Sequence, residues 1–279
     1  MRNFLQDINI VGVTMVYRCF DGIQTRCIEQ LVELCDKVII MLDNYDKDTE
    51  EKVLAYQQKY PKIQVFYSKF ENVTTTKRRG YVYRNFLHQQ GPRRHQVIEK
   101  LHEINKEEKV DLILWPDSDE IFVSNIGEIL THFWQSEKGL IFVRFVSPFN
   151  DFYTLRTPSM YPHARIFKYR LDMSCFKYRK RCNCLPFGRS DRANYGYIDI
   201  HLAYLTAQNR GSRDFHRDKY SMDYKISKLR NECSIYQTDV DVRDMTNYEL
   251  KKLLKRKPDY NFGEYLDKFK IDYYAPTVT

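Results

Sequence analysis

The sequence lacks the features that mark membrane-spanning, secreted or disordered chains. Its 279 residues contain no run of about 20 consecutive apolar residues, the length that a membrane helix needs. Residues 1–20 alternate apolar and polar side chains and show no signal-peptide core. Glycine is scarce, with 10 residues, while 43% of the residues are hydrophobic and 15% are aromatic, so a large core can form. These properties predict a folded cytoplasmic protein without a membrane span.

The spacing of the seven cysteines does not fit a disulfide framework. Their number is odd, and they include no CxxC pair. The one cluster consists of Cys175, Cys182 and Cys184. A zinc site there would need a distant fourth ligand, such as Cys233 or His201. Reduced thiols are therefore the favoured interpretation, with zinc as the alternative.

The formal charge of +8 is concentrated in three basic segments, at residues 77–94, 168–192 and 210–228. Lys and Arg bind phosphates favourably by neutralising their charge. These segments therefore suit an anionic donor, a phosphorylated acceptor or nucleic acid. A solvated basic surface is the alternative, because charge runs usually face water. The charge therefore leaves the class of partner open.

The first half of the chain alternates strand and helix patterns. Short apolar runs predict strands at 8–13, 38–42, 63–67 and 111–115, and helical spacing predicts helices at 23–35, from 49 and from 93. Residues 71–92 show no clean period and contain Gly80 and the Gly91-Pro92 pair, so we expect a long loop there. This order predicts an α/β fold with a mostly parallel sheet covered by helices on both faces.

The second half of the chain does not show this regular alternation of strand and helix patterns. The patterns predict a helix at 126–134 and strands at 140–146, 164–169 and 197–205. The last ~50 residues are charged, and a stripe of leucines there predicts helices.

A group of acids follows the strand expected at 111–115. Asp117, Asp119 and Glu120 lie between apolar flanks, at the strand end where open α/β sheets build their ligand crevices. Carboxylates two residues apart can converge on one hard divalent cation, which keeps positions open for phosphate oxygens. The alternative is a solvated loop or an N-cap for the residues that follow. We favour a metal site, because three adjacent acids between apolar flanks would otherwise repel one another.

This acid motif resembles the DxD element of GT-A glycosyltransferases, close to the family-2 type. Three further segments match that family in the same order, so the resemblance extends over roughly residues 8–220. Residues 10–18 resemble the first strand and the loop that meets the nucleotide, and residues 38–49 resemble the second strand, whose first acid, Asp43, contacts uracil or ribose. The segment from His201 resembles the late segment that supplies another metal ligand. Tyr45 departs from the family, which usually has a small polar residue there.

The resemblance implies a GT-A (Rossmann-like) domain over residues 1–230 and a helical extension at 231–279. Within that domain, residues 1–123 would form the nucleotide-sugar-binding half and residues 124–230 the acceptor half. The implied activity is transfer of a sugar from a nucleotide sugar to a hydroxyl acceptor.

The resemblance also implies site residues. Asp117, Asp119 and His201 are the expected ligands of Mn²⁺ or Mg²⁺. The donor is expected to be a UDP-sugar. The residues expected to bind it are Thr14, Tyr17, Asp43, Arg93, Asp117, Ser118, Arg210 and Arg213. The arginines would contact the donor from the rim of the crevice, since their forked donors match phosphate oxygens.

The catalytic base is less well defined, because the sequence has no clear Glu-Asp pair for the acceptor. An inverting enzyme would need a carboxylate in the second half to deprotonate the acceptor hydroxyl. Asp151 and Asp191 are the candidates by chain position, and both also fit turn acids. Neither stereochemistry nor the base is fixed by the sequence.

The acceptor stays open between two classes. Bacteriophage enzymes that glycosylate hydroxymethylated DNA bases are soluble and basic, so DNA is one candidate, with the host cytoplasm as the compartment. Aromatic and basic residues interleave at 77–86 and 176–192, a composition that suits base stacking and phosphate binding. A glycan or surface polysaccharide is the other candidate.

Two other classes of function use parts of the same pattern. A metal-dependent nuclease or phosphatase could use the acid cluster, but it has no use for Asp43 at a strand end. A nucleic-acid-binding protein without catalytic activity would explain the charge and leave the acids unexplained.

Overall fold

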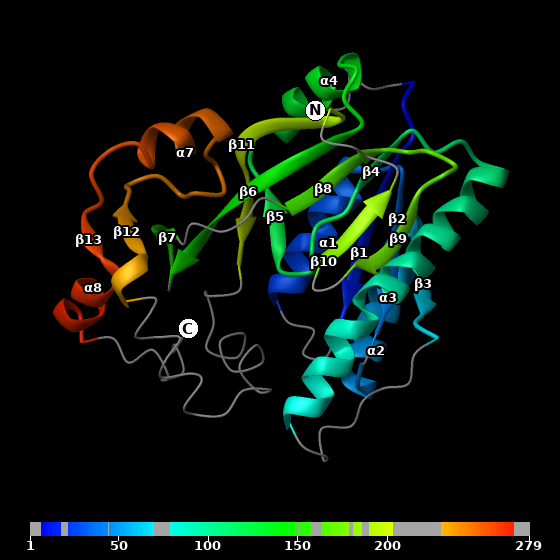
Figure 1. Ribbon diagram of the computed structural model, residues 1–279, viewed down its shortest axis with the longest axis horizontal. Coiled ribbons are helices and arrows are strands. Elements are labelled where there is room, and N and C mark those ends of the chain that lie inside the picture. The colour runs from blue at the N-terminus through cyan, green and yellow to red at the C-terminus, as the bar shows by residue number, and fades with distance from the viewer. Residues whose placement is uncertain are drawn as a thin grey trace. The chain divides into compact units, whose positions relative to one another are not determined.

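The computed structural model divides into two compact units (Figure 1). Unit 1 contains residues 1–118, 130–142 and 164–194, and unit 2 contains residues 119–129, 143–163 and 195–279. The structure describes residues 7–17, 22–43, 45–69, 79–149, 151–157, 163–178, 181–185, 190–202 and 230–270. Within these ranges it describes the backbone alone at residues 79–90, 175–178, 181–185, 199 and 201.

Unit 1 is built on a sheet whose central strands are parallel. Its strands are β1 (Ile10–Val16), β2 (Lys37–Leu42), β3 (Ile63–Tyr67), β4 (Leu112–Leu114) and β8 (His163–Lys168). Their order is β8-β4-β1-β2-β3, with β8 antiparallel to β4 and the other pairs parallel. The chain thus moves outward from β1 through β2 to β3 and then returns to the other side of β1 as β4. This reversal is a topological switch point, the place where open α/β sheets bind ligands.

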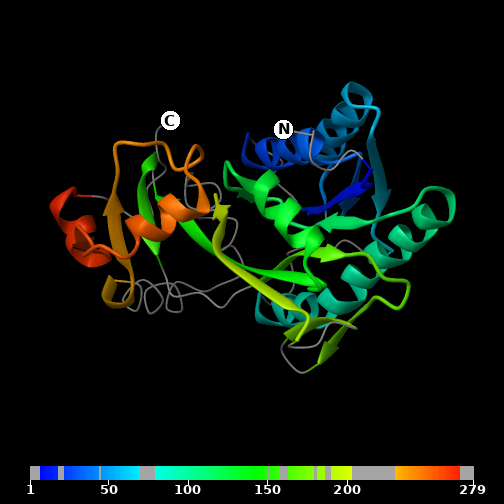
Figure 2. The same cartoon turned by 90° about the horizontal axis from the view of Figure 1, so that it is seen from above.

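Helices cover both faces of this sheet (Figure 2). Helices α1 (Gly22–Leu34) and α2 (Lys47–Lys59) follow β1 and β2, and α3 (Arg79–Glu107) precedes β4. Alternate residues of each strand point to opposite faces. The face opposite α1 carries a cluster of buried residues in which strands β1, β2 and β4 pack against α3. The cluster includes Val11, Val13, Met15, Ile39, Met41, Val97, Ile98, Leu101, Ile104, Ile113 and Trp115.

Helix α1 approaches β1 closely at Gly12. A Cβ atom at this position would lie 2.9 Å from the Sγ of Cys35 and 3.1 Å from a methyl group of Leu31. Both neighbours are fully or almost fully buried, so they have little room to move. Glycine at position 12 therefore sets the distance between α1 and the sheet.

The long loop expected at residues 71–92 is wrong from residue 79 onward. Helix α3 begins at Arg79 and continues through Pro92, so Gly91-Pro92 does not act as a turn. Proline removes one backbone hydrogen bond and crowds the preceding turn. The helix is held beyond this point by the fully buried side chains of Val97, Ile98 and Leu101, so tertiary packing overrides the local signal.

Two further strands of unit 1 form a separate hairpin, β9 (Ser174–Tyr178) and β10 (Arg181–Leu185). Both strands contact α3.

The remaining elements lie wholly or partly in unit 2. The strands are β5 (Glu120–Phe122), β6 (Leu140–Phe149), β7 (Asp151–Thr157), β11 (Arg192–His201), β12 (Ser234–Gln237) and β13 (Tyr260–Asn261). The helices are α4 (Ile126–Gln135), α7 (Asn247–Leu253) and α8 (Phe262–Lys268). Strand β12 pairs antiparallel with both β7 and β13, and β11 pairs antiparallel with β5.

The segment at 231–279, expected to be a helical extension, contains helices α7 and α8 and also the short strands β12 and β13. The packing gives the reason: Ile235 of β12 is fully buried with Phe149, Cys233 and Phe262 in the core of unit 2. A strand of four residues is too short for its alternation to stand out in the sequence. The domain boundary at residue 230 stays a prediction.

The fold class expected from the sequence is confirmed: a mixed α/β sheet whose N-terminal strands are parallel and flanked by helices. None of the helices in the described ranges combines the length and apolar character that crossing a bilayer would need.

Candidate functional site

The carboxyl ends of three neighbouring strands in unit 1 gather the polar residues that the sequence singled out. Tyr17 follows β1, Asp43 follows β2, and Asp117 comes three residues after β4. The fully buried Thr14 Oγ1 donates a hydrogen bond of 3.3 Å to the carbonyl oxygen of Pro116. This contact ties the end of β1 to the loop after β4 at the switch point, where a ligand crevice is expected.

Asp117 is held between two arginines. Its Oδ1 accepts a hydrogen bond of 3.2 Å from Nη2 of Arg94, and its Oδ2 accepts one of 2.5 Å from Nη2 of Arg165. The side chain of Arg165 is only 3% exposed, whereas that of Asp117 is 43% exposed. Arg94 also lies over the ring of Trp115, 5.6 Å from its centroid. The two arginines thus fix the orientation of the carboxylate, while part of the Asp117 side chain remains exposed to solvent.

Asp43 and Arg93 form an ion pair with both side chains fully buried. The sequence placed Arg93 at the rim of the crevice, whereas the structure buries this side chain of α3 completely. Burial lowers the pKa of the Arg93 guanidinium, with an opposing contribution from Tyr17. A buried charge needs such a partner, because desolvating an unpaired ion is costly. Each side chain thus compensates the buried charge of the other where the end of β2 meets α3.

Tyr17 belongs to the same group of charges. Burial raises its pKa; Asp117 raises it further, and Arg94 and Arg93 oppose the shift. The phenol is therefore neutral near pH 7 and can donate a hydrogen bond. This group of charges contains three guanidinium groups, those of Arg93, Arg94 and Arg165. It contains two carboxylates, those of Asp43 and Asp117.

In unit 2, the other two expected metal ligands come from neighbouring strands. The β5–β11 register pairs His201 with Glu120, the residue after Asp119. The backbone N–H of Leu202 donates a hydrogen bond of 2.7 Å to the carbonyl oxygen of Asp119. Glu120 is 2% exposed. Backbone pairing thus places His201 opposite Glu120, and Asp119 opposite Leu202.

The described side chains, which do not include that of His201, contain no group of three or more His, Cys, Asp or Glu residues arranged to hold a metal ion. The expected ligand set therefore stays a prediction.

The remaining predicted residues have these positions. Ser118 is buried, at 9% exposure. Asp151 is exposed, and its Oδ1 accepts a hydrogen bond of 2.9 Å from the N–H of Tyr153, as a turn acid does. The carbonyl oxygen of Asp191 accepts hydrogen bonds of 2.9 and 3.1 Å from the N–H groups of Gly139 and Leu140. Arg210 and Arg213 lie outside the described residues. The roles given to all of these residues stay predictions.

Arg165 is the site residue that sequence reasoning missed. It stands in the apolar strand β8, whose neighbours Ile166 and Phe167 are buried. A charged side chain between buried apolar neighbours in a strand needs a buried partner, and this was the available signal. Its partner Asp117 is 48 residues away in sequence, so periodicity could not identify the pair.

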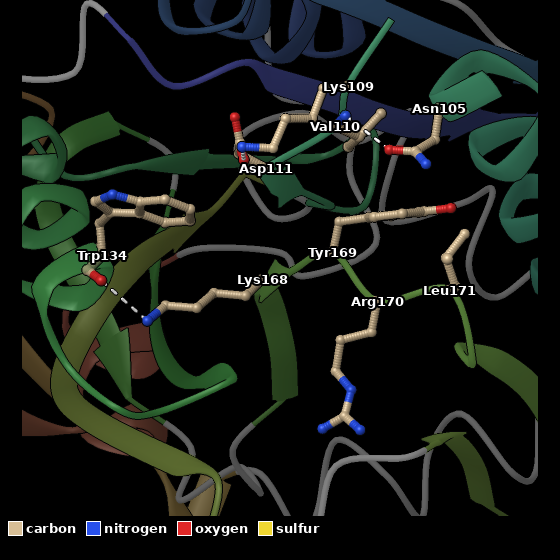
Figure 3. A pocket seen from close by; sticks show the side chains of 9 residues that line it. All are labelled: Asn105, Lys109, Val110, Asp111, Trp134, Lys168, Tyr169, Arg170 and Leu171. Atoms are coloured by element: carbon tan, nitrogen blue, oxygen red, sulfur yellow. Dashed lines mark hydrogen bonds and ion pairs between the residues drawn. The ribbon is translucent and has the colours of Figure 1, made fainter. Parts of the chain in front are cut away.

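A pocket of about 420 Å³ lies elsewhere in unit 1, at the amino end of β4 (Figure 3). Lys109 forms an ion pair of 2.8 Å with Asp111 there, and Lys168 donates a hydrogen bond of 3.0 Å to the carbonyl oxygen of Trp134. Its lining residues are Asn105, Lys109, Val110, Asp111, Trp134, Lys168, Tyr169, Arg170 and Leu171. This pocket is separate from the Asp117 group, which follows the carboxyl end of the same strand.

Comparison with known proteins gives only distant structural similarity. No protein-family model matches the chain, and no curated protein does. The chain is similar to TarS from S. aureus, with a TM-score of 0.41 and 10% identity over 88% of this chain and 42% of that chain. A structure of TarS 1–349 gives a TM-score of 0.40, 10% identity and coverages of 88% and 69%.

A third similar structure is 4-diphosphocytidyl-2C-methyl-D-erythritolsynthase from Anaerococcus prevotii. Its TM-score is 0.32 and its identity 12%, over 95% of this chain and 98% of that chain. The chain thus spans less than half of TarS, and all three TM-scores lie below 0.5. These similarities assign no activity, and the fold class rests on the chain's own strand order.

Proposed function

We propose that this chain is a nucleotide-sugar-dependent glycosyltransferase. The observation that carries the proposal is the group of Asp117, Arg94, Arg165 and Tyr17 at the carboxyl ends of β1 and β4. This is the switch point of an open α/β sheet, where nucleotide ligands bind. A UDP-sugar is the proposed donor.

The charges of the group favour an anionic ligand. The group carries one excess positive charge, because its cations are Arg93, Arg94 and Arg165 and its anions are Asp43 and Asp117. Guanidinium groups bind phosphate oxygens through paired, charge-assisted hydrogen bonds. The amino end of α1 follows β1 in the chain, and a helix amino terminus also favours phosphate. A nucleoside diphosphate combines the charge and the shape that such a site accepts.

The proposed metal ligands are Asp117, Asp119 and His201, for Mn²⁺ or Mg²⁺. Asp117 keeps lone pairs for a cation, because a carboxylate has about four acceptor sites and two hydrogen bonds to arginine use only part of them. An imidazole among carboxylates suits Mn²⁺ better than Mg²⁺. When bound, the cation would supply positive charge to the diphosphate of the donor.

The chain's own residues account for the other steps. Arg94 and Arg165 would stabilise the diphosphate as it leaves the anomeric carbon, because charges that the fold has already oriented stabilise developing charge effectively. Tyr17, neutral near pH 7, would donate a hydrogen bond to the same group. Asp151 and Asp191 are the proposed candidates for the base that deprotonates the acceptor hydroxyl. The proposed acceptor is a hydroxymethylated base in phage DNA, with a glycan as the alternative.

The proposal is tested by thermal unfolding in the presence of UDP- and GDP-sugars, with and without Mn²⁺. A ligand that binds only the folded state raises its apparent stability. We expect a Mn²⁺-dependent increase in Tm with one nucleotide class in the wild type and its loss in Asp119→Ala. Unchanged Tm values with every nucleotide sugar would contradict the proposed donor site.

A further inference from the structure

The pocket at the amino end of β4, the Lys168 pocket, is formed by three segments of unit 1 (Figure 3). These are the end of α3 with the loop to β4, the last turn of α4, and the end of β8 with the turn that follows it. The backbone N–H of Tyr169 donates a hydrogen bond of 2.9 Å to the carbonyl oxygen of Asp111, which joins two of these walls. The volume of about 420 Å³ is within the range of roughly 300–1,000 Å³ that is typical of small-molecule sites.

The walls of the pocket carry more positive than negative charge. Lys109, Lys168 and Arg170 line it, and Asp111 is the one carboxylate among its described lining residues. Both oxygens of Asp111 are engaged: Oδ1 lies 2.8 Å from Nζ of Lys109, and Oδ2 accepts a hydrogen bond of 3.0 Å from the backbone N–H of Asn9. Asp111 and Lys109 therefore compensate each other, and the pocket retains positive charge at Lys168 and Arg170.

Lys168 has no ion-pair partner in the part of the chain that the structure describes. Its Nζ donates a hydrogen bond of 3.0 Å to the carbonyl oxygen of Trp134 and another to that of Ser136, both at the end of α4. An ammonium group has three donors, so two hydrogen bonds leave one N–H for a ligand. Burial lowers the pKa of this ammonium group. An anionic ligand in the pocket would therefore supply the opposite charge that this partly buried cation lacks.

Arg170 adds a second cation at the exposed side of the pocket. Its side chain is 47% exposed, and its Nε and Nη2 donate hydrogen bonds of 3.1 and 3.2 Å to the two carboxylate oxygens of Asp172. An exposed ion pair of this kind contributes little in water. A phosphate can therefore compete with Asp172 for the guanidinium, whose forked donors match phosphate oxygens.

Two aromatic side chains, Trp134 and Tyr169, stand on opposite sides of the pocket (Figure 3). The ring of Tyr169 is held in place by His102, whose Nδ1 lies 2.6 Å from the Tyr169 hydroxyl and whose Nε2 lies 3.2 Å from the carbonyl oxygen of Met173. Because a carbonyl only accepts, Nε2 of the neutral imidazole carries the proton, and the Tyr169 hydroxyl donates to Nδ1. Aromatic side chains stack on the planar faces of bases. The two rings therefore favour a ligand with a planar group.

We propose that the Lys168 pocket binds a nucleoside monophosphate, with the phosphate at Lys168 and Arg170 and the base against the rings of Trp134 and Tyr169. This ligand combines the anionic group that the two cations favour with the planar ring that the aromatic walls accept. A free nucleotide and one nucleotide of a single-stranded nucleic acid share this chemistry. The pocket uses none of the residues proposed for sugar transfer, so it is a second nucleotide-binding site in unit 1.

The test is titration calorimetry of the full chain with a nucleoside monophosphate, without divalent metal. We expect binding in the wild type, a weakening of roughly 10- to 100-fold in Lys168→Met, and a weakening of about 2- to 10-fold in Arg170→Ala. Arg170 is exposed, so its variant tests the proposal even if Lys168→Met misfolds. Lys106→Met is the matched control, because Lys106 is an exposed lysine in the last turn of α3 outside the pocket lining, and it should bind as the wild type does.

Tryptophan fluorescence separates this pocket from the proposed donor site. The chain has two tryptophans, Trp134 in the pocket and Trp115, which lies beside Arg94 of the donor site. Stacking of the base should quench the fluorescence of the wild type without Mn²⁺ and should not do so in Trp134→Phe. Binding at the proposed donor site would instead require Mn²⁺ and be lost in Asp119→Ala.

A short single-stranded oligonucleotide, titrated in parallel, identifies the source of the nucleotide. Tighter binding than that of the monophosphate, weakened in the same variants, assigns the pocket to nucleic acid; equal or weaker binding assigns it to the free nucleotide. The proposal is overturned if neither ligand binds at about 1 mM. It is also overturned if Lys168→Met and Arg170→Ala bind as tightly as the wild type, or if quenching persists in Trp134→Phe.

Discussion

The buried ion pair between Asp43 and Arg93 gives a quantitative test of how β2 is held against α3. Both side chains are fully buried, so removing one partner leaves an uncompensated charge. Such losses typically cost about 3–5 kcal/mol. We therefore expect Arg93→Met and Asp43→Leu each to destabilise the chain by about 3–5 kcal/mol. For a chain of this size that corresponds to a decrease in Tm of roughly 6–20 °C.

The double variant Asp43→Leu/Arg93→Met distinguishes the effect of losing the ion pair on stability from the effect of losing packing. Replacing a whole buried ion pair by apolar residues is often neutral, because the desolvation cost disappears with the attraction. We expect the double variant to be more stable than either single variant, with a coupling energy of at least about 2 kcal/mol in urea unfolding. Additive destabilisation would refute the interpretation that these two side chains compensate each other.

Three other predictions concern the same unit. Arg94→Ala should weaken binding of a nucleoside diphosphate by roughly 10- to 100-fold in calorimetry, as for loss of a charge-assisted hydrogen bond, whereas the exposed Arg144→Ala should not. Gly12→Ala should cost about 1–3 kcal/mol by overpacking, whereas Gly22→Ala, with open space around its Cβ, should cost almost nothing; equal effects would contradict the close α1 contact. The folded state holds the Tyr17 proton more tightly than the unfolded chain does. Stability from this group is therefore present below about pH 10 and lost above it, and Tyr17→Phe should lessen the decline in Tm at alkaline pH.

The parallel core of the fold could be predicted because its signals are local. The apolar runs of β1 and β2 are bounded by helices with regular spacing, although α2 begins at Lys47 with Asp46 as its N-cap and not at the expected Thr49. The start of α3 could not be predicted, because residues 79–90 show no apolar period and Pro92 signals an end that packing overrides. Short strands such as β12 likewise depend on partners that are distant in sequence.

Only part of the candidate site could be predicted, because only some of its signals are local in sequence. Asp117 stands out because it follows an apolar strand, a local signal. Its partner Arg165 and the pairing of Arg93 with Asp43 arise only when strands and helices distant in sequence pack together. Sequence periodicity shows which face of an element is buried, but not which charge lies opposite.

The most direct test of the proposed activity is to incubate the chain with UDP-sugars, Mn²⁺ and either hydroxymethylated DNA or glycans. The released nucleoside diphosphate and the mass of the acceptor are then measured. We expect stoichiometric UDP release and acceptor mass gain in the wild type, and neither in Asp119→Ala. Cleavage of the DNA or hydrolysis of phosphate esters, without sugar transfer, would contradict the account and favour a metal-dependent nuclease or phosphatase.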